Sequence, residues 1–237
     1  MKKVKLTVLI PCLNEEETIE ECITKSLKML NNSKIDGEVL VIDNYSTDKS
    51  YSIAKKSGAR VIKEKNKGYG NALKRGIKEA RGEYIIMGDA DCSYDFDMCP
   101  LFLEKLEEGY DIVMGNRFKG GIEKGAMPFS HKYIGNPILS FIGKVLFNVK
   151  IGDFHCGLRG FNKEKIELLN LESTGMEFAS EMICKSALEK YSFYEIPITL
   201  YKDKRVNTTS HLSSIKDGLR HLKLMLNIRF KGRKHEK

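Results

Sequence analysis

Short β-branched runs alternate with stretches of helical periodicity through the first half of the chain, and this alternation restricts the folds open to it. Residues 4–10 have the pattern of a buried strand, and residues 16–30 have the spacing of an amphipathic helix. Further strands are expected at residues 38–42, 59–62 and 83–87, and further helices from about residue 48 and over residues 69–80. Such alternation favours an α/β fold with a mostly parallel central sheet flanked by helices.

The second half of the chain is less regular. A strand is expected at residues 111–114, a helical region at 128–149, a loop at 152–160, a helix around 177–190, an extended segment at 193–201 and a final helix from about residue 211. A length of 237 residues suits one main domain with small additions. We therefore expect one domain over residues 1–210 and a helical tail over residues 211–237.

Polar residues cluster directly after three of the predicted strands. They are Asn14, Glu15 and Glu16 after the first strand, Asp43, Asn44, Ser46, Thr47 and Asp48 after the second, and Asp89 and Asp91 after the fourth. In a parallel sheet these clusters meet at one edge, where ligands bind. Acidic groups gathered there repel one another unless a cation or hydrogen-bond donors lie among them. The pattern predicts a metal-assisted site.

The Asp89-Ala90-Asp91 triplet is the candidate metal site. Two carboxylates in an Asp-x-Asp segment lie on the same side of an extended chain, close enough to share one hard cation such as Mg²⁺ or Mn²⁺. That cation would bridge a diphosphate and stabilise the charge that builds on it as the leaving group departs. Taken alone, the triplet also fits a solvated acidic turn.

Two further segments have local structural roles that explain only some of their polar residues. They are residues 43–48 and the segment that contains Lys67. Ser46 or Thr47 suits a helix cap and Asp48 a first helical turn, but neither role explains Asp43 and Asn44, whose side chains are suited to reading a nucleobase edge. Lys67, in a glycine-containing segment ahead of a helix, suits a phosphate or sugar contact, and an ordinary surface lysine is the alternative.

Four motifs occur in an order that resembles family-2 glycosyltransferases. They are Pro11-x-x-Asn14-Glu15-Glu16, the segment from Asp43 to Asp48, Asn66-Lys67-Gly68-Tyr69-Gly70-Asn71-Ala72 and Gly88-Asp89-Ala90-Asp91. The resemblance covers about residues 4–210. Within that family the chain is similar to the polyprenyl-phosphate (dolichol-phosphate) mannose or glucose synthases, on the strength of Gly115-Asn116-Arg117, Asp153-x-x-Cys156-Gly157-x-Arg159 and Arg205.

The resemblance implies a Rossmann-like GT-A fold, a nucleoside diphosphate hexose donor and inversion at the anomeric carbon. It implies that residues 1–210 are the catalytic domain. The donor would be bound by Pro11, Asn14, Glu15, Asp43, Asn44, Lys67, Asp89, Ala90 and Asp91, with the metal on Asp89 and Asp91. Asn44, expected to face the base, stands where an aspartate is more usual. An amide both donates and accepts, so uracil and guanine both stay open.

For the acceptor, the resemblance implies that Arg117 and Arg205 meet phosphate groups, with Arg159 either joining them or anchoring its loop through a carboxylate. Asp153 is expected near the acceptor, and the expected catalytic residues are Asp91, Asp153 and Arg117. A phosphate acceptor is already anionic at neutral pH, so Asp153 is needed as a base only if the acceptor is a hydroxyl.

Three functions follow as hypotheses. The leading one is metal-dependent transfer of a hexose to a polyprenyl (dolichyl or undecaprenyl) phosphate at the cytoplasmic face of the membrane. An alternative keeps the donor and uses a soluble or glycan hydroxyl in cell-envelope polysaccharide or glycoconjugate synthesis. A third, of another class, is a nucleotide-sugar-binding protein without turnover.

The charge of the chain is concentrated in its tail. The net charge is +8, and six of these charges fall within residues 212–237, which leaves the rest nearly balanced and argues against nucleic-acid binding. The tail is expected to form a basic amphipathic helix whose apolar positions are Leu212, Ile215, Leu219, Leu222 and Leu226. It could lie on an anionic membrane, or its leucines could pack on the domain or on a second copy.

The cysteines and the apolar segments favour a cytoplasmic protein, either free or peripheral at the cytoplasmic face of the membrane, over one that spans the bilayer. The six cysteines are scattered without a CxxC pair and behind no secretory signal, which favours reduced, buried thiols. The longest apolar stretch, residues 133–149, is interrupted by polar residues and is shorter than the roughly 20 apolar residues that span a bilayer.

Overall fold

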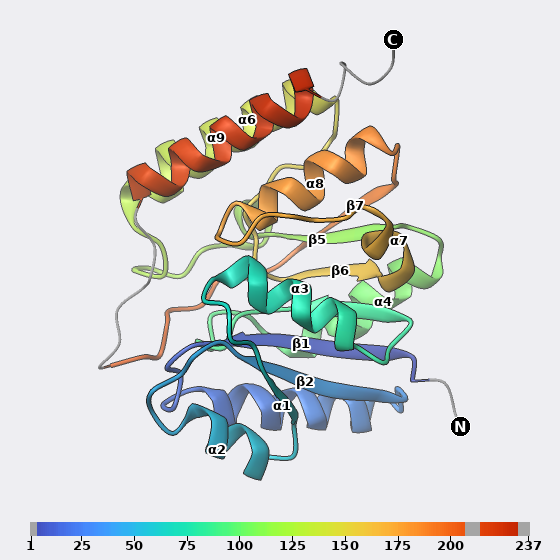
Figure 1. The fold of residues 1–237 in the computed structure, drawn as a ribbon, viewed down its shortest axis with the longest axis vertical. Coiled ribbons are helices and arrows are strands. Elements are labelled where there is room, and N and C mark those ends of the chain that lie inside the picture. The colour runs from blue at the N-terminus through green and yellow to red at the C-terminus, as the bar shows by residue number, and fades with distance from the viewer. Residues whose placement is uncertain (1–3, 207–213, 232–237) are drawn as a thin grey trace.

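The structure is a computed structural model that describes residues 4–206 and 214–231. These residues form a seven-stranded sheet in the order β3-β2-β1-β4-β6-β5-β7. The strands are β1 Leu6–Cys12, β2 Gly37–Asp43, β3 Arg60–Lys63, β4 Tyr84–Met87, β5 Ile112–Asn116, β6 Arg159–Asn162 and β7 Phe193–Pro197. β6 runs antiparallel to β4 and β5, and the other neighbours are parallel. The predicted α/β fold with a mostly parallel sheet is confirmed (Figure 1).

Helices cover the sheet and extend beyond one end of it. They are α1 Ile19–Asn32, α2 Ser50–Lys56, α3 Tyr69–Glu79, α4 Cys99–Glu107, α5 Arg117–Gly120, α6 Asn136–Phe147, α7 Lys163–Leu168, α8 Phe178–Leu188 and α9 Ser214–Lys231, with short turns η1 Phe96–Met98 and η2 His131–Gly135. Every helix and strand predicted within the described residues is present, with shifted ends. The helices α4, α5 and α7 were not predicted.

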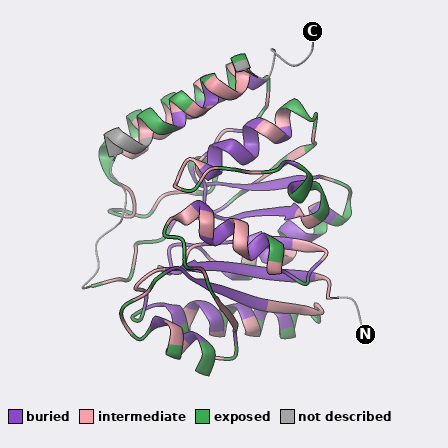
Figure 2. Ribbon diagram, in the orientation of Figure 1, coloured by how far each residue is buried: buried purple, intermediate pink, exposed green. Residues whose placement is uncertain are grey.

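The central strands form the middle of the core. Every residue of β1 is buried, which explains why this strand reads as a continuous apolar run rather than an alternating one (Figure 2). Helix α3 packs on β1 and β2, and it approaches so closely at Gly76 that a Cβ atom there would stand 2.3 Å from Leu9 Cδ1. The six cysteines are buried, as predicted.

The predicted loop at residues 152–160 is wrong at its end, because Arg159 and Gly160 begin β6. This strand pairs with both neighbours, with Gly160 opposite Ile86 of β4 and opposite Val113 of β5. Its sequence, Arg-Gly-Phe-Asn, has neither β-branched residues nor an alternating pattern, so local propensity gives no strand signal. The open edges of β4 and β5 impose the extended conformation on it.

The tail helix α9 packs against α6 and α8 with a face that was not predicted. Its fully or nearly buried side chains are Met225 and His221, whereas Leu219 is 62% exposed and Leu226 is 39% exposed. The expectation that the leucines pack on the domain is therefore wrong for Leu219 and Leu226. The predicted helix start near His211 lies outside the described residues. None of the helices in the described ranges combines the length and apolar character needed to cross a bilayer.

Replacing Met225 by alanine should loosen α9. Met225 is fully buried in a small cluster with Phe147 of α6 and Cys184 of α8, so its truncation leaves a cavity that costs about 2 kcal/mol. The partly exposed neighbour provides a matched control, since Leu226→Ala should change stability by much less. Chemical denaturation gives the stability, and hydrogen exchange of α9 amides locates the change. Equal effects of the two substitutions would contradict this packing.

Candidate functional site

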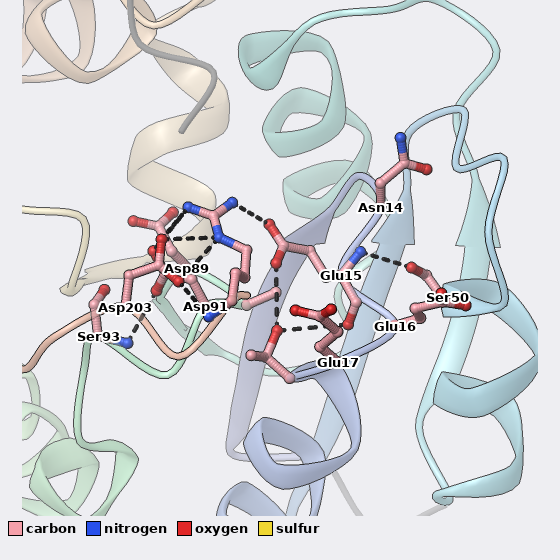
Figure 3. A network of polar contacts seen from close by, with 12 residues as sticks. Asn14, Glu15, Glu16, Glu17, Ser50, Asp89, Asp91, Ser93 and Asp203 are labelled. Carbon is pink, nitrogen blue, oxygen red and sulfur yellow. Dashed lines mark hydrogen bonds and ion pairs between the residues drawn. The ribbon is translucent and has the colours of Figure 1, made fainter. Parts of the chain in front are cut away.

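The carboxyl ends of β1, β2 and β4 bring the predicted polar clusters together. Cys12 at the end of β1 pairs with Asp43 at the end of β2, and β4 lies on the other side of β1. Figure 3 shows Asn14 and Glu15 from the loop after β1 on the same edge as Asp89 and Asp91 from the loop after β4. The prediction that these segments share one edge of the sheet is confirmed.

Asp89 and Asp91 are held in place by neighbouring donors. The Tyr69 hydroxyl donates to Asp89 Oδ1 at 3.0 Å, and the backbone N–H of Ser93 donates to Asp91 Oδ1 at 2.9 Å. Burial raises the pKa of Asp89 to about 6, and the negative charge of Asp91 adds to the rise, against the Tyr69 hydrogen bond and the charges of Arg159 and Arg117. The two carboxylates therefore repel each other in a poorly solvated place.

This carboxylate pair fits a hard divalent cation. Both side chains offer oxygen ligands, and a cation between them would remove the repulsion that raises the pKa of Asp89. Among the described residues, no group of three or more histidine, cysteine, aspartate or glutamate side chains is arranged to hold a metal. Within the described residues, the protein side of such a site thus consists of these two carboxylates.

Arg205 occupies the centre of the acidic edge. Its guanidinium donates to both oxygens of Asp203 and, through Nη1, to Glu15 Oε1 at 2.9 Å. Its Nη2 lies 3.7 Å from Asp91 Oδ2. The Arg205 side chain is 7% exposed, so the network is largely shielded from water. A cation from late in the chain therefore compensates the charge of Glu15, Asp91 and Asp203, which lie together in Figure 3.

Glu15 is the most strongly shifted carboxyl of this edge. Burial raises its pKa to about 7, although the charge of Arg205 opposes the shift. Its backbone N–H donates to Ser50 Oγ at 2.7 Å, and Thr18 Oγ1 donates to its Oε2 at 3.3 Å. Ser50 is the first residue of α2, so this hydrogen bond connects the loop after β1 to that helix.

Hydrogen bonds between side chains and the backbone connect the loop after β1 to the loop after β2. Asn14, in the left-handed region with φ 57°, accepts from the backbone N–H of Thr47 at 2.8 Å, while its own N–H donates to Ser46 Oγ at 3.0 Å. Ser46 and Thr47 therefore do not cap α2 as predicted. The N-cap residue is Lys49, and Asp48 lies before it rather than in the first helical turn as predicted, with its Oδ1 accepting from the backbone N–H of Ser50.

Asn44 and Asp43 have contrasting surroundings. The Asn44 amide donates to the carbonyls of Glu64 and Asn66 and accepts from the N–H of Gly68, so the whole group holds the loop that carries Lys67. Its predicted contact with the base is not tested by these bonds. Asp43 Oδ1, by contrast, is buried without a hydrogen-bond partner among the residues that the structure describes. A buried acceptor of this kind is suited to a donor from a bound ligand.

The remaining predicted donor residues lie around the same edge. Lys67 is exposed, with its Nζ 4.6 Å from the centroid of the Tyr45 ring. Pro11 is buried within β1, and the Ala90 carbonyl accepts from the Cys22 thiol. These contacts give Pro11 and Ala90 a place in the framework of the site, and they leave the Lys67 ammonium accessible to a ligand.

Arg117 and Asp153 form a buried ion pair on the other side of Asp89. Arg117 Nε and Nη2 donate to the two oxygens of Asp153, each at 2.7 Å, and the Arg117 N–H adds a third bond at 3.1 Å. Asp153 is completely buried and does not line the neighbouring pocket. In this structure Asp153 thus lies behind Arg117 and orients it.

Arg159 does not line the pocket either. It is 1% exposed and donates to the carbonyls of Cys156, Phe154 and Ala179. It thus anchors the Gly152–Gly160 loop, as the alternative expectation had it, but through backbone carbonyls instead of a carboxylate. Burial lowers its pKa.

A pocket of about 370 Å³ joins the carboxylate pair to the end of the molecule formed by α6 and α9. Its charged lining residues are Asp89, Asp91, Arg117, Asp203 and Arg205. Its apolar lining residues are Ala126, Met127, Pro128, Leu139, Met176, Ala179 and Leu200. The pocket can therefore take a ligand with an anionic head and an apolar body.

Sequence reasoning did not predict that His155 and His221, which line the same pocket, meet at Ser180. Ser180 Oγ lies 2.7 Å from His221 Nδ1 and 3.3 Å from His155 Nε2, and the two rings meet edge to face. Burial, and then the nearby charges of His221, Arg117 and Arg159, lower the pKa of His155 well below its usual value. Tyr69 was also missed, although it lies within a quoted motif. Asp203, two residues before Arg205, carried no signal of its own.

Residues 7–169 match the model of the family described as Glycosyl transferase family 2. The chain is 41% identical over 222 residues to the low-salt glycan biosynthesis hexosyltransferase Agl6 of Haloferax volcanii, covering 93% of this chain and 53% of that protein. It is 29% identical over 227 residues to the dolichol-phosphate mannosyltransferase of Pyrococcus furiosus, covering 92% of this chain and 63% of the relative. The chain thus spans between about half and two thirds of these two relatives.

Solved structures share the fold. The glucosyl-3-phosphoglycerate synthase from Mycobacterium tuberculosis, solved with Mg²⁺ and uridine diphosphate, superposes with a TM-score of 0.72 at 19% identity, covering 95% of this chain and 79% of that one. At this identity the likeness concerns the fold alone, and it confirms the predicted GT-A architecture.

Glu15 should make the free energy of unfolding depend on pH between about 4.5 and 7. Its folded pKa of about 7 lies above the ordinary value of 4.5, so between these values the folded chain keeps a proton that the unfolded chain has lost. Rising pH should therefore destabilise the wild type relative to Glu15→Gln, by on the order of 2–3 kcal/mol in total. Denaturant titrations of both proteins across that range measure the difference. A difference that stays constant from about pH 4.5 to 7 would contradict the shift.

Proposed function

The chain belongs to glycosyltransferase family 2, and we propose that it transfers a hexose from a nucleoside diphosphate sugar to a polyprenyl phosphate, with inversion and with Mg²⁺ or Mn²⁺. The observation that carries this proposal is the single pocket that joins the Asp89 and Asp91 carboxylates to Arg117 and to an apolar lining. A donor diphosphate with its cation suits the end of the pocket at Asp89 and Asp91. The phosphate of a lipid suits Arg117, and the lipid chain suits the apolar lining.

On the donor side, Asp89 and Asp91 would hold the cation against the diphosphate. When bound, the cation supplies charge stabilisation for the leaving nucleoside diphosphate. Tyr69 and the Ser93 N–H orient the two carboxylates. Asp43, whose buried Oδ1 lacks a partner, would accept from an N–H or O–H of the nucleoside, and Arg205 is close enough to Asp91 to share the charge of the diphosphate.

On the acceptor side, Arg117 would bind the phosphate. Its guanidinium is pre-oriented by Asp153, which removes part of the entropy cost of forming a phosphate contact. Asp153 itself has both oxygens engaged by Arg117, an arrangement that suits a positioning residue better than a base. This fits a phosphate acceptor, because an ionised phosphate oxygen attacks without proton removal.

A hydroxyl acceptor is less well supported by these contacts. It needs a base. The histidines of the pocket are His131, His155 and His221, of which His155 and His221 are engaged with Ser180. The carboxylates among the described lining residues are Asp89, Asp91 and Asp203. The first two are the proposed metal ligands, and Asp203 is bound to Arg205. The relative named as a dolichol-phosphate mannosyltransferase adds support for a lipid phosphate.

Glycolipid formation tests the proposal directly. Protein, Mg²⁺ or Mn²⁺ and a panel of nucleoside diphosphate hexoses are incubated with polyprenyl phosphate, and mass spectrometry detects the product. Asp91→Asn should lower the rate by about 10²-fold or more, because it weakens the charge stabilisation of the leaving group. Asp97→Asn, an exposed aspartate in the same region, is the matched control and should keep the wild-type rate. Donor binding without glycolipid under any condition would refute the acceptor, and an active Asp91→Asn would refute the metal role.

The role of Asp153 is tested by a double-mutant cycle with Arg117. As a positioning residue, Asp153→Asn should raise KM for the lipid phosphate, and the double variant with Arg117→Gln should be little worse than Arg117→Gln alone, because the two residues act as one unit. The pH profile of kcat should keep its shape. A loss confined to kcat in Asp153→Asn, together with a lost limb of that profile, would instead identify Asp153 as a base.

A further inference from the structure

The outer side of η2 and α6 exposes a row of large apolar side chains. Six are involved, and their exposed fractions lie between 52% and 73%: Phe129, Tyr133, Ile134, Ile138, Phe141 and Val145. The spacing of the last four is four, three and four residues, which places them along one side of the helix. The opposite side, with Ser140, Gly143 and Phe147, is buried. Single exposed apolar residues are ordinary, but a contiguous row of this kind marks an interaction surface.

Helix α9 adds a second row beside the first. Leu219, Leu226 and Phe230 are exposed by 62%, 39% and 58%, and helical spacing puts them opposite the buried His221 and Met225. Helices α6 and α9 lie side by side and both turn their buried sides toward α8, where Phe147, Cys184 and Met225 form one cluster (Figure 1). Their exposed rows therefore both face away from the sheet.

The charges around these rows are predominantly positive. Residues 128–150 contain three lysines and no acidic residue, and residues 214–231 contain five lysine or arginine residues against a single aspartate. Lys132, Lys144 and Lys223 lie among the exposed apolar positions. A second copy docking by the same face would bring cation against cation in a two-fold contact, whereas an anionic surface would be attracted.

We propose that this face, formed by η2, α6 and α9, binds the surface of an anionic lipid bilayer. The aliphatic and aromatic side chains enter the boundary between headgroups and acyl chains, and the flanking lysine and arginine residues contact lipid phosphates. Gly135, Asn136 and Leu139 of the same elements, and His221 of α9, line the pocket. Docking therefore places the pocket beside the lipid, a consequence that rests on the proposed function, whereas the binding itself does not.

Vesicle binding tests the surface without donor or acceptor. Wild-type protein is sedimented with vesicles of phosphatidylcholine alone or of phosphatidylcholine mixed equally with phosphatidylglycerol. It should bind the mixed vesicles more tightly, and added salt should weaken that binding. The double substitution Ile138→Glu and Phe141→Glu should lower binding to mixed vesicles by about tenfold or more, since it puts two charges in place of two inserted side chains. Leu168→Glu, at a 74% exposed leucine on α7, is the matched control and should bind like the wild type.

The outcomes separate this proposal from the proposed function. Two results would overturn the proposed membrane-binding surface. One is wild-type protein that does not bind anionic vesicles at low salt, and the other is a double variant that binds them as well as the control variant does. Light scattering that finds a wild-type dimer and a monomeric double variant, with no vesicle binding by either, assigns the face to a second copy and also overturns it. Vesicle binding with no glycolipid product leaves the surface standing and refutes the acceptor alone.

Discussion

The arrangement of the site depends on the compensation of negative charge at one edge of the sheet. Glu15, Asp89 and Asp91 come from loops that a parallel sheet necessarily brings together, and burial raises the pKa of the first two above their ordinary values. Arg205, which lies 190 residues further along the chain than Glu15, supplies compensating charge within the protein. The late segment that carries Asp203 and Arg205 thereby joins an acidic edge whose other carboxylates, Glu15, Asp89 and Asp91, belong to the first half of the chain.

Burial also separates the roles of three arginines that look alike in the sequence. Arg205 lies between carboxylates at the pocket, and Arg117 lines the same pocket while Asp153 fixes its guanidinium. Arg159 is surrounded by backbone carbonyls and fastens the loop instead. A guanidinium serves as a ligand for phosphate only where some of its donors remain free to turn toward the pocket. Tertiary contacts decide which guanidinium donors remain free. The spacing of the motifs in the sequence does not predict this.

The sequence predicted the parts of the fold that local pattern determines. The first four strands and their helices have clear periodicity, and the shared edge of Asn14, Asp43 and Asp89 follows from parallel topology alone. Strand β6 was missed because its conformation is imposed by β4 and β5 rather than by its own residues. The hydrogen bonds of Asn44 were equally beyond prediction, since they depend on how the loop at residues 64–68 folds back over β2.

Helix α9 illustrates why periodicity identifies an amphipathic helix more readily than its buried side. Two apolar rows run along it, one with Leu219 and Leu226 and the other with Met225, and the leucine row is the more hydrophobic by composition. The Met225 row is nevertheless buried, because it carries His221, which meets Ser180 of α8 and the ring of His155. A polar contact available at only one rotation of the helix, together with the space beside Cys184, outweighs the larger apolar area of the leucines. Leu219 and Leu226 therefore face outward, on the side of the helix that we propose contacts the lipid bilayer.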